Sequence, residues 1–179
     1  MEPLTGKLLI SNASLFDPSF RRTVVLVGHH DDEGAVGLVL NRSLGVTVHE
    51  AVPPLTGLVA IDEPVFRGGP VQPDAVVVVA EFDDPSVAEH VAFGRIGFLP
   101  DGLDRGEGGV RRARVFAGYS GWGPGQLEGE LAEDAWIVTD AVPDDVFTDE
   151  PDRLWEGVLL RMGRAFDLLR LMPIDPSSN

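Results

Sequence analysis

The residues best placed to do chemistry lie in the stretch GYSGWGPGQLE, residues 118–128. Glycine-rich loops can cradle phosphates with backbone N–H groups, but no lysine follows here, so the stretch is not a P-loop. The carboxylates of Glu128 and Glu130 already meet the positive end of the following helix, where they would repel a bound anion. The simplest interpretation is a structural turn. The alternative is a site for an uncharged or cationic group, with Gln126 and Glu128 as polar contacts.

Ser120 invites comparison with the nucleophile elbow Gly-x-Ser-x-Gly of hydrolases. Trp122 stands where the second glycine belongs, so the pattern fails. A serine triad also needs a histidine, and the sequence places none of its histidines beside Ser120. A rival enzymatic hypothesis uses Glu128 or Glu81 as an acid/base. It requires a pocket with a desolvated carboxylate and a second titratable group.

The run His29-His30-Asp31-Asp32-Glu33 combines side chains that ligate metals. Neighbouring residues of a strand point to opposite faces, so His29 and His30 cannot easily share one ion. A polar strand end entering a turn is the simpler interpretation, although one histidine with a distant carboxylate stays an alternative. The sequence predicts no cofactor and no metal site.

Two strand ends resemble the rim of a binding pocket, because loops there hold polar groups on a rigid frame. One carries Asn41 and Arg42, and the other carries Gly68, Gly69 and Pro70. Turn chemistry explains both equally simply, since asparagine and glycine accept left-handed backbone angles.

The formal net charge is −15, from 14 basic and 29 acidic residues. Nucleic-acid affinity depends on cations that neutralise phosphates, so an acidic surface disfavours direct DNA or RNA binding and anionic membranes alike. The arginines at positions 111, 112 and 114 form only a small local exception. There is no cysteine, no membrane-length apolar run and no secretory signal, a combination that favours a cytoplasmic protein.

Apolar, β-branched runs separated by turn residues predict strands joined by short turns. The expected strands cover residues 7–11, 23–29, 35–41, 64–67, 75–82, 94–99, 112–119 and 135–139. Helices are expected from a Thr47 cap to residue 52, at 87–91 and at 126–132. Residues 100–109 and 140–152 are expected to be loops. This mixture favours an α+β fold over a doubly wound sheet, with all-β as the weaker alternative.

Apolar residues from Trp155 to Leu169 recur at spacings of four and three, which predicts one long C-terminal helix over residues 152–172. Gly163 is a potential break in it. Residues 173–179 are expected to fray. No linker divides the chain, so residues 1–172 are expected to form one domain.

Several segments in order resemble the AlgH/YqgE family of bacterial proteins over nearly the whole chain. They are GKLLI (6–10), LFDPSFRRTVV (15–25), GAVGLVLNR (34–42), RGGPV (67–71) and GWGPGQLE (121–128). The resemblance implies an α+β domain whose bent, bifurcated, mixed or antiparallel sheet forms a pseudo-barrel flanked by helices. It implies no established activity, cofactor or catalytic residue. Some members are labelled transcriptional regulators, which does not establish DNA contact.

The leading hypothesis is therefore a cytoplasmic, non-catalytic binding or regulatory module that acts through protein or small-molecule contacts. Its candidate surface comprises Asn41, Arg42, Gly68, Gly69, Pro70, Gly121, Trp122, Gly123, Gln126 and Glu128.

Overall fold

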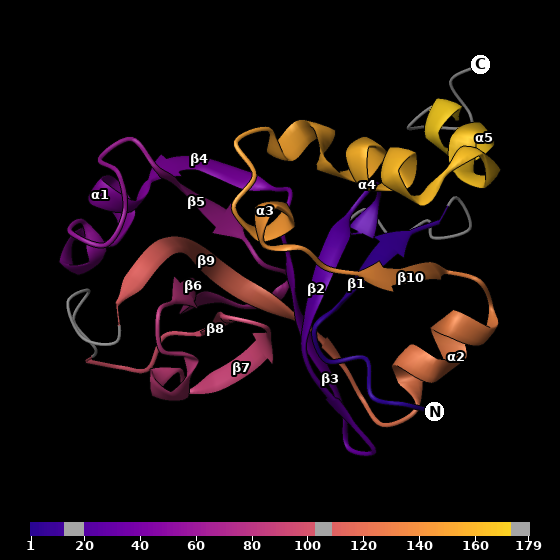
Figure 1. Cartoon of the computed structure of the whole chain (residues 1–179), viewed down its shortest axis with the longest axis horizontal. Coiled ribbons are helices and arrows are strands. Elements are labelled where there is room, and N and C mark those ends of the chain that lie inside the picture. Colours follow the sequence, from indigo (N-terminus) through magenta and orange to yellow (C-terminus); the bar gives the residue numbers. More distant parts are fainter. Residues whose placement is uncertain (13–19, 103–108, 173–179) are drawn as a thin grey trace.

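Paired strands form the frame of the molecule. The computed structural model describes residues 1–12, 20–102 and 109–172 (Figure 1). The strands in this part of the chain are β1 (Lys7–Ser11), β2 (Val24–Asp31), β3 (Gly34–Val39), β4 (Ser43–Thr47), β5 (Pro64–Arg67), β6 (Val71–Phe82), β7 (His90–Phe93), β8 (Ile96–Phe98), β9 (Val110–Trp122) and β10 (Trp136–Asp140). They pair in the order β10-β1-β2-β3-β9-β6-β8-β7, while β5 joins β4 to β9.

The long strand β9 divides the sheet into two halves. On one side it pairs with β6 along most of its length. On the other it pairs antiparallel with β3 near Trp122 and parallel with β5 at Phe116. A strand that shares one edge between two partners forces the sheet to bend and split. The α+β class with a bent, bifurcated, mixed sheet is therefore confirmed.

The sheet curls without closing into a hydrogen-bonded barrel. Its end strand β7 reaches β2 through a side chain, because Nε2 of His90 donates to the carbonyl of Gly28 at 2.8 Å. The ring of Phe98 fills the space above Gly28, where a Cβ would lie 2.7 Å from Cζ of that ring. Side-chain packing thus replaces backbone pairing at this seam.

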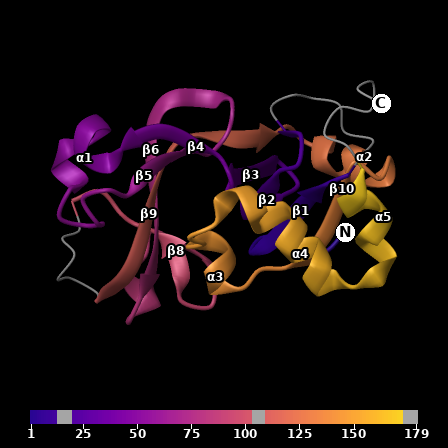
Figure 2. The ribbon, with the colours of Figure 1, turned by 90° about the horizontal axis from the view of Figure 1, so that it is seen from above.

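Alternation along β1 explains why helices cover both faces of one half. Leu8 and Ile10 belong to the core that includes α4 (Leu154–Met162), whereas Leu9 packs on the side of α2 (Gln126–Ala132). Both residue sets are fully buried. In Figures 1 and 2, α4 and α5 (Asp167–Leu171) lie against β1, β2 and β10.

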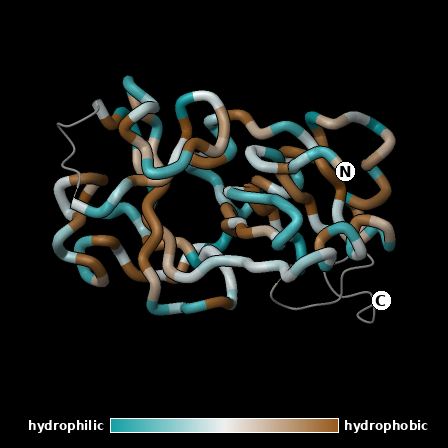
Figure 3. Tube along the Cα trace, turned by 90° about the horizontal axis from the view of Figure 1, so that it is seen from below, coloured by the Kyte–Doolittle hydropathy of each residue, from teal (hydrophilic) through white to brown (hydrophobic). Residues whose placement is uncertain are grey.

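The other half has its own core. Phe82, Val110 and Val115 pack there with Val48 of α1 (Val48–Ala51), at the end of the molecule opposite α5 (Figure 2). Figure 3 shows hydrophobic stretches of the chain in both halves of the molecule. No helix in the described part of the chain is long and apolar enough to cross a membrane.

Several helices and strands lie where the sequence predicted them. The helix expected over residues 126–132 is α2, and Thr47 caps α1 through a reciprocal capping box with Glu50. The strand expectations are met by β1, β2, β3, β5, β6, β8, β9 and β10, with ends that differ by a few residues.

Three expectations need correction. The long C-terminal helix is divided at Gly163, whose φ of 111° interrupts the helix, so α4 and α5 are separate. The helical turn expected over 87–91 is instead a 3₁₀ turn, η3 (Pro85–Val87), followed by strand β7. The loop expected over 140–152 contains α3 (Pro143–Val146) and leads into η4 (Pro151–Arg153).

Strand β4 lies where the sequence predicted neither a strand nor a helix over most of its length. The side chains of β4 are mostly exposed, so the segment lacks the alternating apolar pattern that reveals a half-buried strand. The tail expected to fray, 173–179, and most of the loop at 100–109 lie outside the described residues. The one-domain boundary at residue 172 stays a prediction.

Candidate functional site

The candidate residues from the two strand ends hold the backbone together. Oδ1 of Asn41 accepts the N–H of Val24 at 3.1 Å, and Nδ2 donates to the carbonyl of Arg22 at 2.9 Å. Nη2 of Arg42 donates to the carbonyl of Arg21 at 2.6 Å. These bonds tie the end of β3 to the start of β2, so both side chains have a structural role.

Gly68 and Gly69 are buried against β9. A Cβ on Gly68 would lie 2.3 Å from the carbonyl oxygen of Gly118, and one on Gly69 would lie 2.3 Å from the carbonyl carbon of Tyr119. Oγ of Ser120 donates to the carbonyl of Gly68 at 3.1 Å. The glycine pair therefore permits close backbone packing, and only the following Pro70 is exposed.

The glycine-rich stretch splits into a strand and a short turn. Gly121 and Trp122 end β9, and Trp122 is only 6% exposed. Its ring packs beside Phe20 and Trp136. The turn is closed by Gln126, whose Oε1 accepts the N–H of Gly123 at 3.0 Å.

The candidate residues thus fall into two places rather than one. Asn41, Arg42 and the Gly68–Gly69 pair lie near the end of β3, because the carbonyl of Gly68 accepts the N–H of Val39 at 2.8 Å. Trp122 pairs with Ala35 at the start of β3. The length of that strand separates the glycine-rich turn from the other candidates.

Glu128 has an unexpected partner in His30. Oε1 of Glu128 lies 2.6 Å from Nε2 of His30, whose side chain is 4% exposed. Nδ1 of the ring accepts the N–H of Leu4 at 3.0 Å, so the ring proton resides on Nε2 and donates to the carboxylate. This hydrogen bond from His30 lowers the pKa of Glu128. His29 faces outward to Asp31, as strand alternation predicts.

Both ring nitrogens of His30 are therefore occupied, which leaves no lone pair for a metal. A pocket of about 350 Å³ beside the pair is lined by Asp31, Asp32 and Gly125 as well. Among the described residues, no group of three or more histidine, aspartate or glutamate side chains could hold a metal ion. The lowered pKa of Glu128 favours a permanently ionised carboxylate over a general acid.

The other acid/base candidate, Glu81, belongs to a network of ion pairs. Its Oε2 lies 3.1 Å from Nη2 of Arg112, which also pairs with Asp144 at 3.0 Å. Arg111 pairs with Asp83, and the buried Arg114 pairs with Glu63 at 3.1 Å. Each arginine of the small cationic cluster thus faces a carboxylate.

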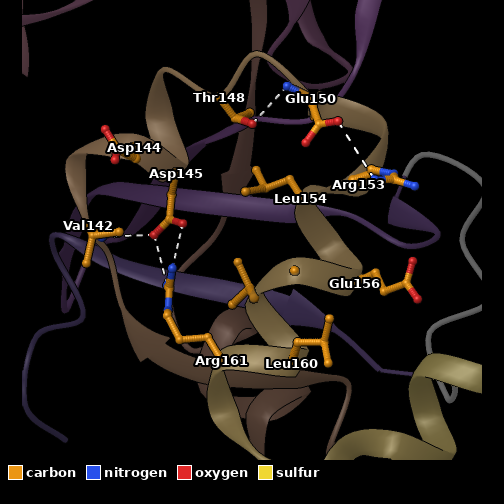
Figure 4. Close-up of a pocket in the computed structure, with 12 residues that line it drawn as sticks. Val142, Asp144, Asp145, Thr148, Glu150, Arg153, Leu154, Glu156, Leu160 and Arg161 are labelled. Atoms are coloured by element: carbon orange, nitrogen blue, oxygen red, sulfur yellow. Dashed lines mark hydrogen bonds and ion pairs between the residues drawn. The ribbon is translucent and has the colours of Figure 1, made fainter.

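A cavity of about 630 Å³ lies between α3 and α4, and Figure 4 shows residues that line it. Its carboxylates are paired with arginines: Asp145 with Arg161 at 2.8 Å, and Glu150 with Arg153 at 3.8 Å. Asp145 also accepts the N–H of Val142 at 2.9 Å. The pair of Asp145 and Arg161 thus forms a joint between α3 and α4.

A second cavity of about 630 Å³ has a different character, and we call it the β6 cleft. Strands β3, β6 and β9, the 3₁₀ turn η2 (Pro53–Leu55) and the segments around β8 surround it. Its apolar lining residues are Val36, Leu38, Val52, Pro54, Leu55, Val76, Val77, Val78, Phe98, Leu99 and Pro100. Its polar side chains are those of Glu89, His90, Asp101 and Tyr119.

None of the candidate residues inferred from the sequence lines the β6 cleft as described. The cleft draws on strands far apart in the chain, so no local motif reveals it. The nearest signal is the valine-rich run at 75–82, and exposure of Val36 and Val76 at 41% and 47% becomes apparent only in the fold.

Comparison with known proteins shows the family to which this chain belongs. A family model described as AlgH-like matches residues 8–167. The chain belongs to the AlgH-like family.

Relatives and solved structures agree with this membership. A UPF0301 protein of Streptomyces avermitilis is 40% identical and covers 98% of this chain and 95% of its own length. A UPF0301 protein of Mycobacterium ulcerans is 42% identical, and the match covers 97% of this chain and 90% of that protein. The crystal structure of a Corynebacterium diphtheriae protein has a TM-score of 0.86 at 27% identity, covering 95% and 93%. The solution structure of AlgH from Pseudomonas aeruginosa has a TM-score of 0.72 at 28% identity, and the match covers 96% of this chain and 95% of that one.

The AlgH-like resemblance expected from the sequence motifs is therefore confirmed. The names of these four proteins state no activity, ligand or partner.

Proposed function

We propose that this AlgH-like protein is a non-catalytic binding module that takes a small, mostly apolar molecule in the β6 cleft. The observation that carries the proposal is the cleft's lining. Sites for small molecules are concave, measure roughly 300–1,000 Å³, and are lined by apolar side chains with a few polar groups. The β6 cleft, at about 630 Å³, matches this description.

The carboxylates considered for catalysis support a binding role over an enzymatic one. Glu81 is paired with Arg112 and Glu128 with His30, and neither glutamate is among the residues of the cleft. A regulatory role, a cytoplasmic location and the lack of direct nucleic-acid binding stay predictions from the sequence.

The test uses 1-octanol as an apolar probe, with its affinity measured by titration calorimetry. Val76 is 47% exposed and lines the cleft, so Val76→Trp should fill the cleft without disturbing the core. Val46→Trp is the matched control, because Val46 is 40% exposed on β4 and away from the cleft. A strand accepts tryptophan at either position.

We expect the wild-type protein and Val46→Trp to bind octanol equally, and Val76→Trp to bind it at least roughly tenfold more weakly, a difference of about 1.4 kcal/mol. Octanol binding that is absent, or that survives Val76→Trp unchanged, would refute the proposal.

A further inference from the structure

We infer that the ligand of the β6 cleft is an amphipathic cation, an apolar body that carries an ammonium or similar group. The inference rests on the proposed function, and it adds the charge of the ligand to the apolar character already argued.

The first support is the sign of the charge at the cleft. Glu89 and Asp101 line it, and no lysine or arginine does so among the described residues. Both carboxylates are exposed, and within the described part of the chain neither forms an ion pair. The cavity in Figure 4 is the internal contrast, because arginines neutralise its carboxylates.

The second support is the position of the two carboxylates. The N–H of Glu89 donates to the carbonyl of Phe98 at 3.0 Å, and Asp101 follows Phe98 by three residues. Both acidic residues thus lie by the end of β8. The valines of β3 and β6 supply an apolar wall. One polar end and one apolar wall match a molecule with a charged head and a hydrocarbon body.

The third support is the hydrogen-bonding character of His90. Its Nε2 donates to the carbonyl of Gly28, so the neutral ring keeps Nδ1 as an acceptor. The two carboxylates and His90 share the polar part of the cleft with Tyr119, whose hydroxyl both donates and accepts, so acceptors outnumber donors among these side chains. An ammonium group, which carries donors only, is the complement. The net charge of −15 also draws cations toward the molecule.

The experiment compares three probes with the same hydrocarbon chain: octylammonium, 1-octanol and octanoate. Each is titrated at neutral pH into the wild-type protein and into the double variant Glu89→Gln with Asp101→Asn. The control double variant, Glu133→Gln with Asp152→Asn, removes the same charge from exposed positions outside the cleft. The Val76→Trp variant shows which binding belongs to the cleft.

We expect octylammonium to bind roughly five- to tenfold more tightly than octanol, as two partly exposed carboxylates allow, and octanoate to bind most weakly. The Glu89/Asp101 variant should bind octylammonium no more tightly than octanol, with its octanol affinity unchanged. The control variant should keep the wild-type affinities for both probes. If octanol binds in the cleft and octylammonium binds no better, the cationic ligand is refuted and the binding module stands. If none of the probes binds, both proposals fall.

Discussion

Nε2 of His30 lies 2.6 Å from Oε1 of Glu128, and the two residues are 98 positions apart in the chain. The same ring accepts the N–H of Leu4 through Nδ1. One buried imidazole on β2 therefore connects the N-terminal segment to α2, and its neutral form is the one that satisfies both hydrogen bonds.

This pair predicts a pH-dependent contribution to stability. The hydrogen bond from His30 lowers the pKa of Glu128 in the folded protein. The contribution is therefore present above the pKa of the unfolded chain, about 4.3, and is lost as the pH falls through the lowered folded value. Glu128→Gln removes this titration, so its melting temperature should fall less between about pH 5 and pH 3 than that of the wild type.

Thermal melts of both proteins across this range provide the measurement. Glu133→Gln is the control, because Glu133 is exposed at the end of α2. It should follow the wild-type curve. Parallel acid limbs for Glu128→Gln and the wild type would show that the pair contributes nothing.

The joint between α3 and α4 depends on one buried carboxylate. Asp145 receives two hydrogen bonds from Arg161, at 2.8 and 3.0 Å, and the bonding to Asp145 raises the pKa of that arginine (Figure 4). Asp145→Ala should lower the free energy of unfolding by about 1–2 kcal/mol, because the Val142 N–H and the partly exposed Arg161 both lose their buried partner. The neighbouring Asp144 is 89% exposed, so Asp144→Ala should cost less than about 1 kcal/mol. Urea unfolding measures the loss of stability in both variants. Equal losses for Asp145→Ala and Asp144→Ala would contradict the structural role of Asp145.

The Gly69 position should reject any side chain. Its φ is 156°, and a Cβ would overlap the backbone of Tyr119 and Ser120. Gly69→Ala should therefore destabilise the fold by roughly 3 kcal/mol or more. Gly129→Ala is the opposite case, because Gly129 lies within α2 with nothing near its Cβ, and it should stabilise by about 0.5–1 kcal/mol. Chemical denaturation measures both, and a tolerated Gly69→Ala would mean that the backbone can shift there.

Arg114 should matter for folding far more than its neighbour Arg111. Its guanidinium is buried, pairs with Glu63, and donates to the carbonyls of Val146 and Thr148 at 3.2 and 2.7 Å. Arg114→Met should cost about 3–5 kcal/mol because Glu63 loses its counterion. Arg111 is half-exposed, so Arg111→Met should cost under about 1 kcal/mol. Similar midpoints in guanidinium titrations of the two variants would count against this role.

Much of the local structure could be predicted because its signals are local. The valine-rich run at 75–82 forms most of β6, and Thr47 caps α1 as its sequence position predicted. The net charge of −15 likewise predicts, without reference to any contact, that nucleic acids and anionic membranes are not partners. The motif order identified the family. Local signals missed β4, whose exposed side chains carry no periodic pattern, and they wrongly predicted a helical turn where β7 begins.

Only the tertiary structure determines which distant side chains lie together around the β6 cleft and in the pair of His30 and Glu128. Gly68 and Gly69 stand beside polar residues in the sequence, yet in the fold they allow close packing against the backbone of β9. That close approach depends on which strand lies beside them, and the sequence pattern does not show it. His30 and Glu128 meet only because β2 and α2 are adjacent. The β6 cleft combines β3, β6 and β9 with two carboxylates near β8. By itself, the sequence determined the class, the family and most elements through short-range propensity and pattern. Side chains far apart in the chain become neighbours only through strand pairing, which the sequence pattern does not specify.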